Sequence, residues 1–294
     1  MELSSYFRGL LTRIEPQPDY VDKAKAAHQE VRKRLASDPD IGDAHVDTFL
    51  SGSYVRHTAV QHIKDVDVIC VVNIDWIITK PELTLALLQQ ALQQYYDAVE
   101  PQGRSIHIKT QEGVALDIVP GTPVSRLDGP LRIPDRDVKA WVLTHPKAQI
   151  TFSEQQNART GGYYKPLVKI AKFWRDRLPH ENARPKSYLL EILVSEGLAF
   201  TPPSHASGFV QTLESIRDRY GPYAEAGQVP EILDSGYPTV NVAKRWTVTE
   251  FQAFLAHVRA AARTARAALN EPAQDESERL WRSLFGTQFT PPDS

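Results

Sequence analysis

The chain has 294 residues, of which 41% are hydrophobic and 24% charged, and its formal net charge is −2. This length suffices for one large or two medium domains with a well-buried core, and the near-neutral charge provides no general field for binding long nucleic acid. The only cysteine, Cys70, has no partner for an internal disulfide and excludes a cysteine-rich zinc site.

The amino-terminal segment is too polar for a signal peptide, and no apolar run of about 18 residues is present to span a membrane. We therefore expect a cytoplasmic protein without a membrane partner. Any chemistry on nucleic acid would have to be local, in a cleft.

The first half of the chain alternates predicted helices and strands. Residues 19–36 carry apolar side chains at spacings of three and four, which predicts an amphipathic helix. Residues 44–53 predict a short strand that ends in a Gly-Ser turn, and residues 65–74, β-branched almost throughout, predict the clearest strand. Residues 81–99 predict a second helix, and residues 104–121 predict a hairpin around a Gln-Glu-Gly turn.

The second half of the chain changes character. Residues 121–162 contain four prolines and predict a loop-rich joint between two lobes. Beyond this joint, residues 163–177, residues 187–200 and later segments show helical periodicity. The sequence thus predicts an α/β (α+β) protein: residues 1–150 form a mixed-sheet lobe with an amino-terminal helix that spans both lobes, and residues 151–294 form a helical lobe.

Acidic residues occur on two of the predicted strands. Asp65 and Asp67 are two apart, so both project from one face, and Asp117 lies in the second strand of the hairpin. Three converging carboxylates repel one another unless a cation neutralises them, and oxygen-only ligands suit Mg²⁺ or Mn²⁺, two of which clamp the oxygens of a phosphoryl transfer. An isolated Asp-x-Asp is more often a solvated turn or a helix cap, and Asp117 alone fits a strand-edge charge. The apolar strands have no structural use for these charges, which favours the metal site.

A Gly-Ser turn precedes these acids. It consists of Ser51, Gly52 and Ser53, twelve residues ahead of Asp65. The backbone N–H groups and hydroxyls of such a turn can bind phosphate oxygens, and glycine lets the phosphate approach closely. An ordinary turn is the alternative for so short a motif. The sequence contains no G-x-x-x-x-G-K-[ST] motif, which excludes a P-loop enzyme.

A basic segment opens the second lobe. Residues 165–186 contain seven Lys or Arg residues and two acidic ones. Lys165, Lys169 and Lys172 recur at helical spacing, which predicts one cationic helix face able to meet a triphosphate across a cleft. A solvated helix face is the alternative.

The combination of Gly52-Ser53, Asp65-x-Asp67 and Asp117 fifty residues further on resembles the polymerase-β-like nucleotidyltransferase superfamily. The segments LVKIAKFW and RPKSYLLEILV look like the part of cyclic GMP-AMP synthase and 2′-5′-oligoadenylate synthetase relatives that carries a phosphate-contacting lysine and serine. The string SGSYVRHTAVQHIKDVDVICVV is similar to the signature of their bacterial members, the CD-NTases of anti-phage (CBASS) signalling, as are VNVAKRW and SLFGTQF. The resemblance covers residues 20–290.

The resemblance implies a fold, a polymerase-β-like nucleotidyltransferase lobe with a mixed sheet plus a helical carboxy-terminal lobe, and roles for single residues. Asp65, Asp67 and Asp117 would hold two Mg²⁺ (or Mn²⁺) ions, with Asp117 also helping to deprotonate the acceptor hydroxyl. A nucleobase would stack on Tyr188. The remaining matched residues would bind the triphosphate: Ser51, Gly52, Ser53, Lys172, Ser187 and, as a second cation, Lys169.

The implied reaction is nucleotidyl transfer, in which a ribose hydroxyl attacks the α-phosphate of an NTP, ATP among them, and pyrophosphate leaves. Repeated transfers with an intramolecular last step would make a cyclic di- or trinucleotide second messenger. A linear-oligonucleotide synthase, an antitoxin-type enzyme that transfers AMP, and an inactive nucleotide-binding module remain alternatives. The family also implies a regulatory protein partner from a CBASS operon, whereas one cysteine cannot build the zinc thumb that docks vertebrate relatives on DNA. No motif reports base choice, linkage or ring size.

Overall fold

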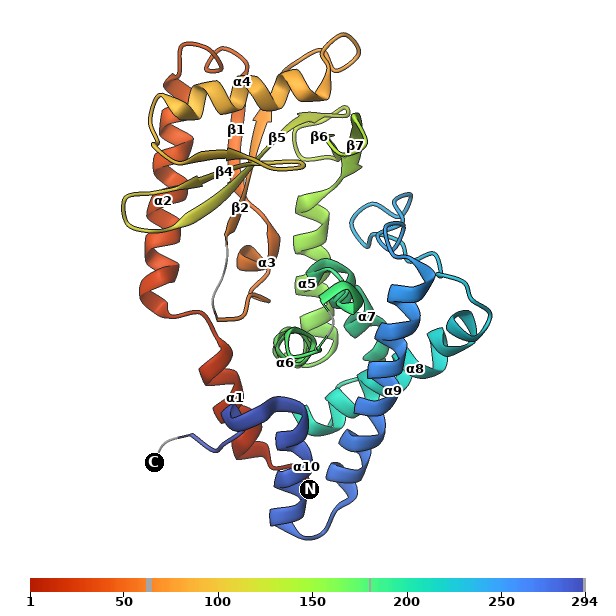
Figure 1. Cartoon of the computed structure of the whole chain (residues 1–294). Helices are drawn as coiled ribbons and strands as arrows, with labels where there is room; N and C mark the ends of the chain where they lie inside the picture. Colours follow the sequence, from red (N-terminus) through yellow and green to blue (C-terminus); the bar gives the residue numbers. More distant parts are fainter. Residues whose placement is uncertain (62–64, 180, 293–294) are drawn as a thin grey trace. The chain divides into compact units, whose positions relative to one another are not determined.

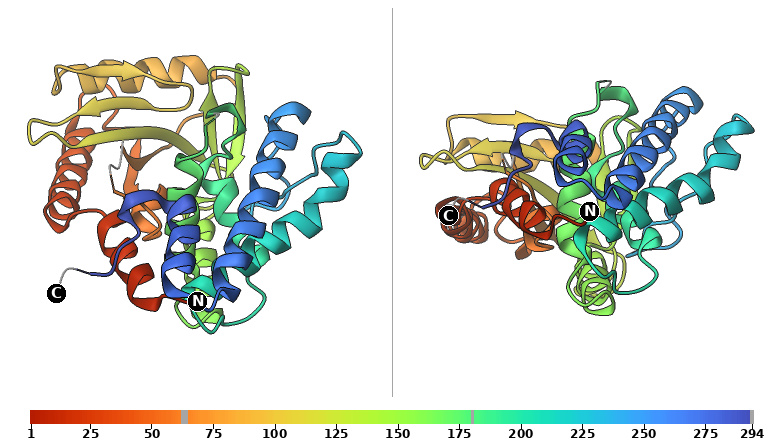
Figure 2. Two further views of the ribbon diagram at one scale, coloured as in Figure 1. Left: turned by 60° about the horizontal axis from the view of Figure 1, so that its bottom comes forward. Right: turned by 90° about the horizontal axis from the view of Figure 1, so that it is seen from below.

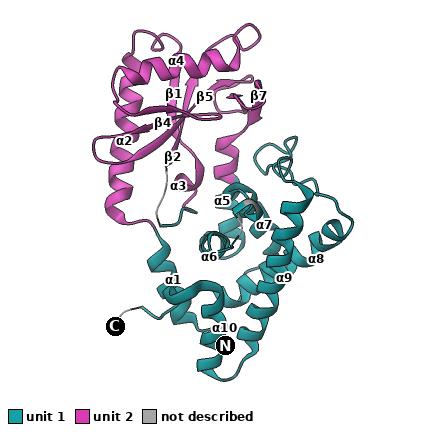
Figure 3. Cartoon of the chain, viewed as in Figure 1, with its two compact units in different colours: residues 1–15, 58–61, 152–294 teal, residues 16–57, 62–151 magenta. Residues whose placement is uncertain are grey.

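The structure is a computed structural model that describes residues 1–61, 65–179 and 181–292. The chain divides into two compact units (Figure 3). Unit 1 comprises Met1–Glu15, Thr58–Gln61 and Phe152–Ser294, and unit 2 comprises Pro16–His57 and His62–Thr151. No helix in the described ranges is long and apolar enough to cross a bilayer.

Unit 2 is built on a mixed sheet (Figure 1). Its strands lie in the order β1-β2-β5-β4-β3, with β6 pairing both β5 and β7; β2 and β5 are parallel, and the other pairs are antiparallel. This mixed sheet confirms the predicted fold class for the first lobe. The elements in chain order are α2 (Pro18–Ser37), β1 (His45–Leu50), α3 (Gly52–Val55), β2 (Val66–Val72), α4 (Pro81–Gln93), β3 (Val99–Pro101), β4 (Ile106–Lys109), β5 (Ala115–Pro123), β6 (Leu131–Asp135) and β7 (Ala140–Thr144).

The two faces of this sheet differ because side chains alternate along each strand. On one face, Val66 and Val68 of β2 and Leu116 and Ile118 of β5 are buried with the apolar residues of α2 and α4, the two helices that lie against the sheet (Figures 1 and 2). The residues between them in the sequence therefore project from the opposite face. Both strand aspartates belong to this second set.

The predicted elements of unit 2 are largely confirmed. The helix expected at residues 19–36 is α2, and the hairpin expected at residues 104–121 is formed by β4 and β5. The helix expected at residues 81–99 ends at Gln93, because Val99 already begins the edge strand β3.

The prediction of a loop-rich joint at residues 121–162 is wrong. This segment contains the end of β5, the hairpin of β6 and β7, and α5 (Pro146–Arg159). Pro134 pairs with Trp141 of β7 but lies beyond the residues of β6 that pair with β5. Among the described residues it therefore has a strand on one side only, which is where a sheet tolerates proline. Pro146 is the first residue of α5, where its missing N–H removes no helical bond.

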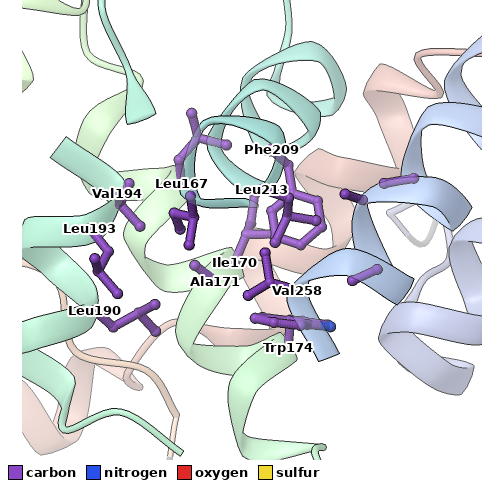
Figure 4. Packing of buried hydrophobic residues seen from close by; sticks show 14 of the residues in the cluster. Leu167, Ile170, Ala171, Trp174, Leu190, Leu193, Val194, Phe209, Leu213 and Val258 are labelled. Carbon is purple, nitrogen blue, oxygen red and sulfur yellow. The ribbon is translucent and has the colours of Figure 1, made fainter. Parts of the chain in front are cut away.

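Unit 1 is helical, as predicted for the second lobe. Its core is formed by Leu167, Ile170 and Trp174 of α6, Leu190 of α7 and Phe209 of α8, with α9 packed beside them (Figure 4). Helices α8 and α9 lie side by side (Figure 2). The elements are α1 (Ser4–Ile14), the end of α5, α6 (Tyr164–Asp176), η1 (Glu181–Ala183), α7 (Ser187–Gly197), α8 (His205–Glu225), α9 (Val248–Asn270), α10 (Gln274–Phe285) and η2 (Gly286–Gln288).

The first helix of the chain belongs to unit 1 by its packing. The ring of Phe7 in α1 meets the edge or face of Trp281, Phe285 and Phe289 at centroid distances of 5.1, 5.8 and 5.0 Å. Phe7 is fully buried there. Because the partners are aromatic residues near the carboxy terminus, residues 1–15 group with the helical unit although they precede α2 of unit 2 in the sequence.

Candidate active site

Two of the predicted metal ligands lie side by side in unit 2. Asp67 of β2 and Asp117 of β5 are direct partners in the parallel ladder, so their side chains leave the same face of the sheet. Neighbouring strands are separated by about 4.8 Å, and two carboxylates at this spacing repel each other. The pairing supplies the convergence that the sequence predicted for these two residues.

The Gly-Ser turn is packed directly on Asp67. The backbone N–H of Ser51 donates to the carbonyl oxygen of Asp67 at 2.8 Å. Gly52 has a φ of 69°, and a Cβ atom at this position would lie 2.6 Å from Asp67 Cγ and nearer still to Oδ2. Only glycine fits here, because it tolerates the left-handed backbone and has no Cβ atom to collide with Asp67. Ser51 is buried, and half-buried Ser53 is in the first turn of α3.

Asp65 stands just before β2, two residues from Asp67. Burial raises the pKa of the Tyr20 phenol in α2, and the charge of Asp65 raises it further, so this carboxylate lies within electrostatic range of α2. Within the described ranges, no group of three or more His, Cys, Asp or Glu side chains is arranged to hold a metal ion, so the structure brings Asp67 and Asp117 together as ladder partners but shows no three-residue cluster with Asp65. The donor chemistry still fits Mg²⁺, because this ion usually takes one or two carboxylates and completes its shell with waters and substrate phosphates.

Two residues that no sequence motif indicated hold Asp117. His107 of β4 is its antiparallel partner, and the His107 Nδ1 to Asp117 Oδ1 distance is 2.7 Å. Gln102 Nε2 donates to the same oxygen at 3.3 Å. The predicted hairpin could have indicated His107. His107 and Asp117 lie equally far from Glu112, the centre of the predicted turn, so the two residues face each other across the hairpin.

The cationic face predicted for α6 is neutralised by acidic residues of unit 1. Its three lysines each contact a carboxylate at 2.6–2.7 Å: Lys165 with Glu154, Lys169 with Glu15, and Lys172 with Glu191. The helix prediction is confirmed, and the three lysines of the predicted cationic face are each paired with a carboxylate in this structure. The sequence could not reveal this, because Glu15 is 154 residues away from Lys169.

Lys172 is the most enclosed of these lysines. Lys172 and Glu191 are 2% and 1% exposed, and their side chains are 2.7 Å apart. Lys172 Nζ also donates to the Thr58 carbonyl at 3.0 Å, and the Thr58 hydroxyl donates to Glu191 Oε1 at 3.0 Å. The three residues form a buried group held together by hydrogen bonds. A triphosphate that contacts Lys172 must therefore replace one of the present partners of its ammonium group.

The two remaining predicted contacts open helix α7. Ser187 is its first residue and is exposed, and its hydroxyl accepts a hydrogen bond from Arg175 Nη1 at 3.0 Å. The hydroxyl of Tyr188 lies 2.8 Å from Asp234 Oδ1 and 2.7 Å from Ser235 Oγ. Asp234 is buried and also accepts the backbone N–H of Gly236 at 2.7 Å. The ring of Tyr188 is thus fixed at its far end by the loop that follows α8.

Paired aspartates on a mixed sheet, next to a glycine-dependent turn, fit the class of nucleotidyltransferases. The profile of the Second Messenger Oligonucleotide or Dinucleotide Synthetase domain matches residues 1–157, more than half of the chain. The chain belongs to this family, and its resemblance to the CD-NTases is confirmed. As a member of this family it is a second-messenger synthetase.

Known proteins similar to this chain agree with that assignment. A cyclic AMP-AMP-AMP synthase from Acinetobacter sp. is 35% identical over 298 residues, which cover 98% of this chain and 86% of the relative. A probable cyclic AMP-AMP-GMP nucleotide synthase from Salmonella paratyphi B is 30% identical over 355 residues, which cover 98% and 92%.

Solved structures share the fold. CdnC of E. coli MS115-1 with ATP superimposes with a TM-score of 0.78 at 19% identity, covering 99% of both chains. The same CdnC in complex with HORMA-deltaN gives a TM-score of 0.76 at 18% identity, covering 98% of this chain and 99% of the other. The predicted two-part architecture, a mixed sheet and a helical region, is therefore that of known CD-NTases.

Proposed function

We propose that this chain joins NTPs, ATP among them, into a cyclic trinucleotide and releases pyrophosphate. The observation that carries the proposal is the in-register pair of Asp67 and Asp117 beside the glycine-dependent turn at Ser51-Gly52. The names of two relatives at 30% identity or more, a cyclic AMP-AMP-AMP synthase and a probable cyclic AMP-AMP-GMP synthase, support a trinucleotide over a dinucleotide.

Asp65, Asp67 and Asp117 are proposed to hold two Mg²⁺ ions, with Mn²⁺ as a substitute. The ions, when bound, supply positive charge at the attacking and leaving oxygens of the transfer. The chemistry of the side chains supports this proposal: they are hard oxygen donors, and Asp117 Oδ2 accepts no hydrogen bond from the described residues.

The protein itself would mainly position the substrates. Backbone and hydroxyl groups of Ser51, Gly52 and Ser53 would bind the donor triphosphate beside Asp67, with further contacts from Ser187 of α7. Lys169 and Lys172 would join these contacts by exchanging their glutamate partners for phosphate. The ring of Tyr188, fixed at its hydroxyl, would stack on a nucleobase.

In each transfer the acceptor ribose oxygen forms a bond to the α-phosphorus of the donor, and the bond from that phosphorus to its β-bridging oxygen breaks. Pyrophosphate leaves with the electron pair of the broken bond. Asp117 is proposed to accept the proton of the attacking hydroxyl. The third transfer is intramolecular and closes the ring.

Mass spectrometry of the products from the four NTPs, alone and mixed, tests the proposal. A cyclic trinucleotide that resists phosphatase is expected, and Asp67→Asn with Asp117→Asn should abolish it. A phosphatase-sensitive oligomer would favour the linear synthase, AMP attached to a protein would favour the antitoxin-type enzyme, and no product would favour the inactive binding module. A regulatory partner is proposed by analogy with the CdnC:HORMA-deltaN complex, and pyrophosphate release with and without a co-encoded partner would measure its effect.

A further inference from the structure

His107 lies beside the paired aspartates, and the proposed function assigns it no role. The ladder places His107 of β4 opposite Asp117 of β5, and Asp117 opposite Asp67 of β2. The three residues therefore form one row across three adjacent strands. Because the partners in a ladder share a face, His107 leaves the sheet on the same side as the two carboxylates.

The contact between His107 and Asp117 is directional. An ionised carboxylate only accepts hydrogen bonds, so at 2.7 Å the proton of this bond belongs to His107 Nδ1. Gln102 Nε2 reaches the same oxygen, Oδ1, from the loop between β3 and β4 at 3.3 Å. Both donors engage Oδ1, and neither engages Oδ2.

We infer that His107 is a positioning residue: it fixes the rotamer of Asp117 through Oδ1 and keeps Oδ2 available to a divalent cation. The inference rests on the proposed function and extends it, since it names the group that orients the ligand. A carboxylate held by a strong donor loses little rotational freedom when it binds a metal. Removal of a group that orients a metal ligand in this way typically lowers the metal affinity about 10- to 100-fold. Gln102, at the longer distance, is the weaker second donor.

A purely structural role is the competing explanation, because cross-strand partners also stabilise sheets. His107→Phe and His107→Asn separate the two roles. Phenylalanine keeps an aromatic ring on the strand but donates no hydrogen bond, whereas asparagine loses the ring but keeps an N–H donor close to the position of Nδ1. Lys109→Ala is the matched control, since Lys109 lies on the same strand and face, is exposed, and pairs with Ala115.

Two measurements on the full-length chain test the inference. The first is the dissociation constant of Mn²⁺ without nucleotide, measured from the EPR signal of the free ion. The second is the Mg²⁺ concentration that gives half-maximal pyrophosphate release at saturating NTP. For His107→Phe we expect both values to rise at least about tenfold. His107→Asn should stay within a few-fold of the parent chain, Lys109→Ala should leave both values unchanged, and thermal melting should show all variants folded.

The inference is overturned if His107→Phe binds Mn²⁺ and requires Mg²⁺ as the parent chain does, or if the phenylalanine and asparagine variants are weakened equally. If His107→Phe does not fold, His107→Ala takes its place, with the same expected result. Failure of the proposed function looks different: the parent chain would then make no oligonucleotide from any NTP mixture, while the Mn²⁺ titration would still report on His107.

Discussion

Replacing Gly52 by alanine should separate catalysis from folding in this chain. A Cβ atom at residue 52 would lie 2.6 Å from Asp67 Cγ, whereas carbon atoms in ordinary contact are about 3.5 Å apart or more. The carboxylate of Asp67 would have to retreat by about 1 Å, and a misplacement of about 1 Å at a reacting centre can lower a rate on the order of 100-fold. The left-handed backbone, with a φ of 69°, adds about 1–2 kcal/mol of destabilisation.

Gly113→Ala is the matched control for this prediction. Gly113 has a φ of 82°, so alanine is strained there too, but no atom lies within 4 Å of its Cβ position. The left-handed backbone strains alanine at both positions, and at residue 52 the clash with Asp67 adds to that strain. Gly52→Ala should therefore lose at least as much free energy of unfolding as Gly113→Ala in thermal or urea melts, and only Gly52→Ala should lose pyrophosphate release by about two orders of magnitude. Similar turnover in the two variants would refute the assignment of Asp67 to the reaction.

Four further outcomes are expected. Glu191→Leu leaves the buried ammonium of Lys172 without its carboxylate and should lower the free energy of unfolding by about 3–5 kcal/mol. Adding Lys172→Met to this variant should restore much of the lost free energy. Urea melts of the single and the double variant test both expectations. Tyr188→Phe removes the bonds to Asp234 and Ser235 but keeps the ring, so KM for NTP should rise several-fold with little change in kcat, in contrast to a large loss of both for Tyr188→Ala. Burial raises the pKa of Cys70 to about 12, so the thiol should resist Ellman's reagent at about pH 8 until the chain unfolds. The unfolded chain loses this thiol proton at lower pH than the folded one, so the free energy of unfolding should fall as the pH rises from about 9 to 12.

Local patterns predicted the elements that carry the aspartates. The β-branched run after Asp65 predicted the clearest strand of the chain, and the turn at residues 111–113 set the register of the hairpin. That register pairs His107 with Asp117, so the partner of the third aspartate was implied by the sequence, although no motif contains it. The prolines of residues 121–162 misled the prediction, because an edge position and a helix start accommodate proline as readily as a loop does.

Charge was harder to predict than secondary structure. Helical spacing placed Lys165, Lys169 and Lys172 on one face, but the carboxylates that neutralise them come from α5, from α7 and from Glu15, the residue that follows α1. Sequence spacing describes neighbours on one helix, whereas an ion pair depends on which helix lies alongside. The same holds for Tyr188, whose hydroxyl is held by residues 46 and 47 positions further on.

The sequence by itself determined the types of residue available for chemistry and the strands, turn and helices that carry them, because periodicity and turn chemistry act over a few residues. The tertiary structure alone decided that Asp67 and Asp117 are partners, that Gly52 touches a carboxylate, and that Lys172 is buried against Glu191. These facts depend on which distant segments pair and pack, and that choice is made by burial of the whole apolar surface of each unit rather than by any local pattern.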